Sequence, residues 1–175
     1  DGYPAGLSLH ARESALRQRG IGMLTLGEAE EAFAAFAASL SLIEQEPTAF
    51  PPLRLAEARI YLAEAAIDLG RPEVAETHLA RAETAVLAEY PPGHDERARL
   101  QGLKALAAAW RQSPPDPAAA DTPGTVGQQV ALLRRANTGD CTGARALLAT
   151  LDSGTPRTLR QRARMRWISS RLTTT

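Results

Sequence analysis

The chain has 175 residues and equal numbers of basic and acidic side chains, 20 of each, so its formal net charge is zero. It contains 34 Ala and 23 Leu but only 4 Val and 5 Ile. This composition excludes most β folds, because strands favour β-branched and aromatic residues whereas Ala and Leu favour helices. Aromatic residues make up only 5% of the chain. We therefore predict an all-α domain built from stacked helix pairs rather than around one thick core.

The zero net charge is a cancellation between two parts of the chain. Residues 1–124 carry 11 basic and 18 acidic side chains, whereas residues 125–175 carry 9 basic and 2 acidic ones. Such an asymmetry predicts electrostatic contact between the two parts, within one copy or between neighbouring copies. Self-association is therefore one of the partner hypotheses.

Apolar periodicity and helix-breaking residues predict five helices in the first part of the chain. These helices are expected over residues 8–26, 28–45, 53–69, 72–90 and 95–112. Gly27 and Gly70 stand where the first and third helices should end, and Pro72 stands in the first turn of the fourth, where its missing N–H costs nothing.

The proline segment 113–125 divides the chain, since three prolines in its first five positions forbid a helix there. We interpret it as a linker or loop between helical repeats over 1–112 and a terminal part over 126–175. Helices are predicted in that terminal part over 126–137, over 140–151 with Asp140 as N-cap, and over 157–172.

Three glycines are followed by similar residues at the same spacing, which indicates an internal repeat. Ala follows each glycine at the fifth position, and a large apolar residue follows at the ninth. The triplets are Gly27, Ala32 and Phe36; Gly70, Ala75 and Leu79; and Gly139, Ala144 and Leu148. A small residue one turn into a helix lets its neighbour approach closely, and the large one fills the space beside it.

These residues resemble the tetratricopeptide repeat (TPR), in which pairs of helices stack into a solenoid. Leu62 and Ala63 match its first helix, and Gly70, Ala75 and Leu79 match its turn and second helix. The step of 43 residues from Gly27 to Gly70 exceeds the usual repeat of about 34. It is similar to the longer variant of kinesin light chains and bacterial signalling proteins. The resemblance implies a right-handed TPR-like α-solenoid of about seven helices with a terminal helix.

The resemblance also implies a function, because the first helix of each TPR pair lines a concave groove that binds a peptide or a partner helix. We therefore expect a non-catalytic protein–protein interaction module, a scaffold or regulatory part of a larger bacterial protein. Carried over by position, the partner-binding residues are Arg17, Ile21, Leu24, Glu57, Ile60, Glu64, Ile67, Asp68, Gln129, Leu133 and Asn137. Leu103 and Trp110 are further possible contributors. The apolar and acidic alternation of residues 57–68 would suit a ligand with basic and apolar side chains.

Enzyme signatures are scarce, so we predict no catalysis and no cofactor. The three histidines, His10, His78 and His94, are far apart in the sequence and lack metal-ligand spacing; we expect His78 to be a surface residue. The single cysteine, Cys141, has no partner for an internal disulfide and suits a reducing, cytoplasmic setting. No run of 18 apolar residues predicts a membrane span. Because the chain opens with Asp1, we interpret it as an excised domain or a processed chain.

The last predicted helix favours an alternative function, since it carries six arginines and no acidic residue. Clustered arginines engage phosphates, so the chain could be an accessory domain of a transcription regulator or nucleic-acid-associated protein. Arg160, Arg162 and Arg164 are the candidates for this electrostatic contact. A near-neutral pI and the lack of a reading motif weigh against nucleic acid. A third hypothesis, an enzyme domain with no recognisable site, also stays open.

Overall fold

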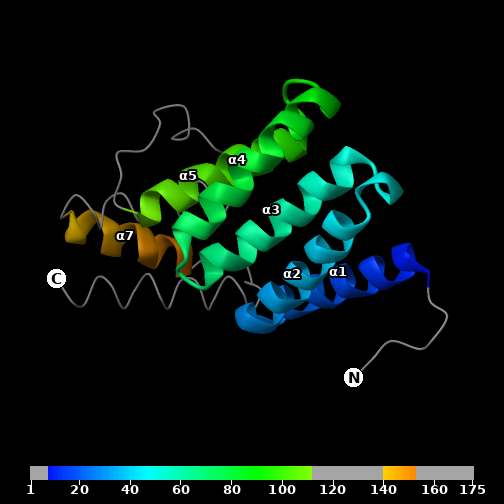
Figure 1. Cartoon of the computed structure of the whole chain (residues 1–175). Helices are drawn as coiled ribbons and strands as arrows, with labels where there is room; N and C mark the ends of the chain where they lie inside the picture. The colour runs from blue at the N-terminus through cyan, green and yellow to red at the C-terminus, as the bar shows by residue number, and fades with distance from the viewer. Residues whose placement is uncertain (1–7, 112–139, 153–175) are drawn as a thin grey trace.

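The computed structural model describes residues 8–111 and 140–152 (Figure 1). In this part the chain forms six α-helices, a short 3-10 helix at Pro47–Ala49 and no strand. The α-helices are α1 (Leu9–Leu26), α2 (Ala29–Gln45), α3 (Pro52–Asp68), α4 (Pro72–Glu89), α5 (Asp95–Trp110) and α7 (Cys141–Asp152). The all-α prediction is confirmed, and these helices begin and end within two residues of the predicted bounds. The segments predicted as a linker over 113–125 and as helices over 126–137 and 157–172 lie outside the described residues.

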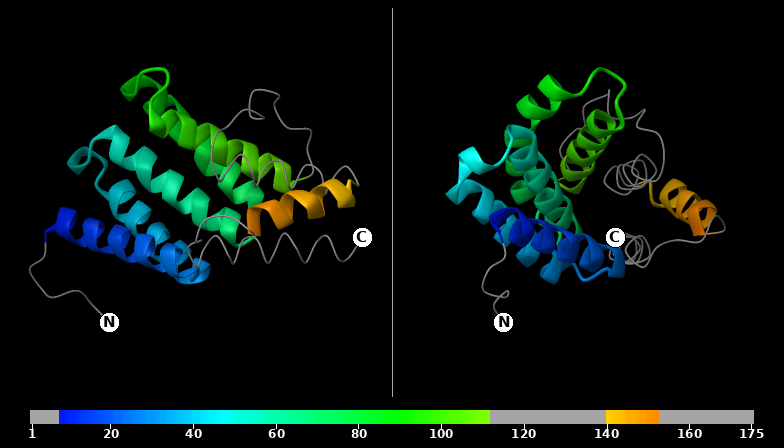
Figure 2. Two further views of the ribbon diagram at one scale, coloured as in Figure 1. Left: turned by 180° about the vertical axis from the view of Figure 1, so that it is seen from behind. Right: turned by 90° about the vertical axis from the view of Figure 1, so that its right-hand side faces the viewer.

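The first five helices form consecutive antiparallel neighbours (Figures 1 and 2). Each of them packs on the next one along the chain, from α1 to α5. In addition, α1 contacts α3 and α3 contacts α5. Since every connection reverses the chain, α1, α3 and α5 run in the same direction, and α3 contacts both of the others.

Two hairpins repeat with the same internal geometry at a spacing of 43 residues. The first residues of α1, α3 and α5 are Leu9, Pro52 and Asp95, each 43 residues after the one before. The turns also correspond: Gly27 and Gly70 both have left-handed φ, 87° and 69°. In each turn the next N–H donates to a carbonyl of the preceding helix, Glu28 to Met23 at 2.9 Å and Arg71 to Ala66 at 2.8 Å. The predicted glycine caps are therefore confirmed in both hairpins.

The second helices of the two hairpins place equivalent residues in the core. Ala32 and Ala75, the small residues after each turn, are completely buried, and so is Ala144 of α7. Phe36 and Leu79 are 1% and 0% exposed. At the start of α7, the Asp140 carboxylate accepts the Gly143 N–H at 2.8 Å, which confirms the predicted N-cap.

Gly20 in the middle of α1 allows α1 to lie against the ring of Phe36. A Cβ at this position would fall 2.5–2.7 Å from three atoms of that ring, closer than real Cβ contacts allow. In the second hairpin the equivalent positions hold Ala63, which is larger than Gly20, and Leu79, which is smaller than Phe36. The two hairpins thus fill the same place with complementary pairs of side chains.

Helix α3 joins the two parts of the core. Its residues Ala58, Leu62 and Ala65 belong to a cluster with α1, α2 and Phe50. Its residues on another face, including Ile60 and Ile67, belong to a second cluster with α4, α5 and Ala144 of α7. An all-helical fold with packed neighbours follows from these contacts.

Candidate partner-binding face

The predicted partner-binding residues of α1 and α3 fall into two groups in the structure. Leu24, Ile60 and Ile67 are at most 4% exposed and belong to the core clusters. A ligand on the surface of this structure does not reach them, so we assign these three residues to packing. The other five stay partly exposed, namely Arg17, Ile21, Glu57, Glu64 and Asp68. We call these five residues the first-helix face.

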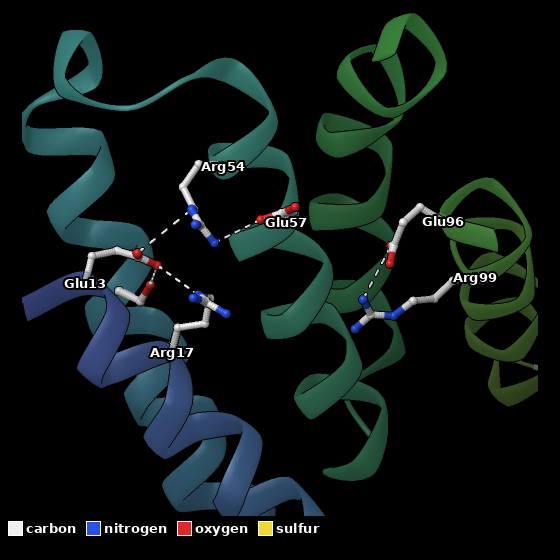
Figure 3. Close-up of polar contacts among 7 residues, drawn as sticks. Glu13, Arg17, Arg54, Glu57, Glu96 and Arg99 are labelled. Carbon is white, nitrogen blue, oxygen red and sulfur yellow. Dashed lines mark hydrogen bonds and ion pairs between the residues drawn. The ribbon is translucent and has the colours of Figure 1, made fainter. Parts of the chain in front are cut away.

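A polar network centred on Glu13 joins α1, α2 and α3 (Figure 3). Glu13 is only 2% exposed, and its carboxylate accepts a hydrogen bond from the Ser39 hydroxyl at 3.0 Å. Arg17 and Arg54 lie on either side, with their Nε atoms 3.7 and 3.9 Å from the carboxylate oxygens. Arg54 also pairs with Glu57 at 3.0 Å. Glu57 is therefore already matched by a positive charge of its own chain.

A second network joins α3 and α5 through Arg99. Its guanidinium lies 2.8 Å from the Glu64 carboxylate, 3.4 Å from Glu96 and 4.6 Å over the ring of Tyr61. Tyr61 in turn stacks on Phe36 of α2. Burial acts to lower the pKa of Arg99, but the ion pair and hydrogen bond to Glu64 outweigh burial and raise that pKa above its ordinary value.

These pairs change the charge pattern that a partner would meet. The sequence indicated an apolar and acidic line over residues 57–68, suited to a basic ligand. In the structure Glu57 and Glu64 are each bound to an arginine, so positive and negative groups alternate across α1, α3 and α5. A purely basic ligand would have to displace Arg54 and Arg99 from their carboxylates.

Sequence reasoning did not single out Glu13, Arg54, Tyr61 or Arg99. One signal could have found the first pair: a repeat of 43 residues brings positions near 11–13 of α1 level with positions 54–56 of α3. Opposite charges at Glu13 and Arg54 then lie at the same height on neighbouring parallel helices. No comparable signal marks Arg99. Its partner Glu64 lies about two helical turns further along α3 than the position that the 43-residue repeat brings level with Arg99.

The remaining predicted site residues lie outside the described residues. They are Gln129, Leu133, Asn137, Arg160, Arg162 and Arg164. Among residues 8–111 and 140–152, no three His, Cys, Asp or Glu side chains are grouped so as to hold a metal ion. None of the helices in that part combines the length and apolar character needed to cross a membrane.

His78, which we expected on the surface, is partly buried on α4. Its Nδ1 atom is buried and makes no hydrogen bond in the described part of the chain. Burial lowers the pKa of His78 below its usual 6.5; the nearby charges of Arg81 and Arg59 lower it further, and Glu44 opposes them. The folded protein therefore favours the neutral imidazole.

This burial predicts a loss of stability in mild acid. Because the unfolded chain binds the His78 proton more readily, the contribution of this residue is fully present above about pH 6.5. It is lost as the pH falls from there through the lowered pKa. Urea unfolding of the wild type and of His78→Gln at several pH values between 7 and 5 should show a shallower decline for the variant. Parallel declines would contradict the assignment.

Comparison with known proteins adds no relative, since no protein-family model, curated protein or solved structure matches the chain. The resemblance to the tetratricopeptide repeat therefore stays a prediction from the sequence.

Proposed function

We propose that the chain is a non-catalytic protein–protein interaction module that binds a peptide or a partner helix on the first-helix face. The observation that carries this proposal is the contact of α3 with both α1 and α5, three helices that start at intervals of 43 residues. Repeating the same hairpin places the same face of each first helix side by side. Further hairpins stacked in the same way would form a right-handed TPR-like solenoid.

The charge pattern of this face supports a partner of mixed charge. Glu57 and Glu64 hold Arg54 and Arg99, and the Arg17 guanidinium lies beside buried Glu13. A ligand with both acidic and basic side chains can exchange contacts with these pairs without leaving one charge unmatched. Electrostatic complementarity of this kind selects among partners more than it adds affinity.

The proposal is tested by selecting ligands for the full chain from a displayed library of peptides and then measuring their affinity for two variants. Glu57→Gln combined with Asp68→Asn removes two carboxylates from the first-helix face. We expect about tenfold weaker binding, the effect of losing one charge-assisted contact. Glu31→Gln removes an exposed carboxylate from α2 and should leave affinity unchanged.

The two variants separate the possible outcomes. Equal weakening by Glu31→Gln and by the double variant would place the binding surface elsewhere. An unchanged affinity in both would also contradict the proposed face. Circular dichroism of each variant establishes that the helices are retained.

A further inference from the structure

Helix α1 contributes less to the core than its counterpart in the second hairpin. Among its 18 residues only Glu13, Gly20 and Leu24 are buried, whereas α3 buries eight of its 17. One of the three is a charged group and one has no side chain. Two glycines within α1, Gly20 and Gly22, also weaken its intrinsic helix propensity.

Apolar and polar contacts together hold α1, but most of its apolar side chains are only partly buried: Leu24 belongs to the core cluster, whereas Leu9, Ile21 and Met23 pack against that cluster without being fully covered. The His10 ring lies tilted against the Phe50 ring, with the ring centroids 4.7 Å apart. The Glu13 carboxylate accepts a hydrogen bond from the Ser39 hydroxyl and faces Arg54. Further along, Gly20 rests against the Phe36 ring. Segments with little buried apolar surface belong to the low-stability end of a protein and open before the rest.

We propose that α1 is a detachable helix that opens from α2 and α3 while α3 and α4 stay folded, with Glu13 as its latch. Glu13 is the buried group that reaches both neighbours at once, Ser39 on α2 and Arg54 on α3. Opening moves this carboxylate into water and releases Ser39 and Arg54. It also uncovers the rings of Phe36 and Phe50, which are 1% and 7% exposed in the closed form. Opening of α1 thus controls access to an apolar surface formed by Phe36 of α2 and by Phe50, which lies shortly before α3.

Hydrogen exchange of the full chain, followed by mass spectrometry, tests this inference without a partner and independently of the proposed function. We expect amides of α1 to exchange at least about tenfold faster than those of α3. Glu13→Gln should speed exchange in α1 by about a further tenfold, the effect of losing a charge-assisted hydrogen bond, and leave α3 and α4 unchanged. Glu44→Gln is the matched control, because it breaks an ion pair of 3.2 Å between α2 and α3 that does not involve α1.

A stabilising variant keeps the test decisive if Glu13→Gln does not fold. A Cβ at Gly22 would meet nothing within 4 Å, so Gly22→Ala strengthens α1 without altering its contacts. It should slow exchange in α1 about fivefold, as expected from helix propensity, and leave α3 unchanged. The inference is overturned if α1 and α3 exchange at one rate, or if Glu44→Gln speeds α1 as much as Glu13→Gln does.

Discussion

Replacing Gly20 with alanine is expected to lower the free energy of unfolding by about 1–3 kcal/mol, the usual cost of overpacking a core. The direction is informative, because alanine in the middle of a helix normally stabilises it relative to glycine. Here the added Cβ would fall 2.5 Å from the Phe36 ring. Urea unfolding followed by circular dichroism measures the change. Gly22→Ala, two residues away with free space around it, should instead raise stability.

The second hairpin supplies a rescue for the same variant. It holds Ala63 and Leu79 at the positions equivalent to Gly20 and Phe36, so the double variant Gly20→Ala, Phe36→Leu copies a pair that the fold already accepts. Phe36→Leu alone should cost about 1–2 kcal/mol, through lost volume and lost stacking on Tyr61. We expect the double variant to be more stable, by at least about 1 kcal/mol, than the sum of the two single stability changes predicts. If the two single stability changes simply add, the Phe36 ring is not the reason for a glycine at position 20.

Replacing Glu64 with glutamine is expected to cost about 2–3 kcal/mol, because it leaves a largely buried arginine without its main partner. Arg99 has a side chain that is 29% exposed and lies between Glu64, Glu96 and the Tyr61 ring. Glu96 is more distant and cannot replace the pair at 2.8 Å. Thermal and urea unfolding both report the change. Glu30→Gln removes a pair with Arg71 in which both side chains are about half exposed or more, and it should cost less than about 0.5 kcal/mol.

A paired substitution distinguishes an unmatched charge from a simple loss of contact. If the cost of Glu64→Gln comes from stranding Arg99, then Glu64→Leu with Arg99→Met should recover most of the stability, since apolar pairs often replace buried ion pairs without loss. A double variant as unstable as Glu64→Gln would contradict this explanation. The result also bears on binding studies, because Glu64 cannot be changed on the first-helix face without disturbing α5.

The helices were predictable because their limits depend on local chemistry. Glycines at 27 and 70 end helices in a left-handed conformation, and Pro72 starts one. Such signals act over a few residues and can be recognised in a linear sequence. The same holds for Asp140, whose side chain caps the helix that follows it.

The surface was less predictable because it depends on rotation and stagger. Neighbouring positions on a helix point about 100° apart. A small error in the predicted rotation of a helix about its axis therefore assigns a core residue to the groove, or a groove residue to the core. For this reason the sequence predicts Leu24, Ile60 and Ile67 on the groove, whereas the structure buries all three. The pair of Arg99 and Glu64 depends on how far α5 is offset from α3, and local patterns carry no such distance. The reason for Gly20 is likewise not visible in the sequence of α1, because the ring that a Cβ there would meet lies on α2.

The connectivity of the helices has a consequence for folding. Within residues 8–111, the main contacts between helices join each helix to the next one or the next but one along the chain. Loops that close over such short distances cost little chain entropy, and a low contact order predicts rapid folding. Order can therefore spread outward from any adjacent pair of helices. We expect it to start around α3, which belongs to both core clusters, and α1 to join last.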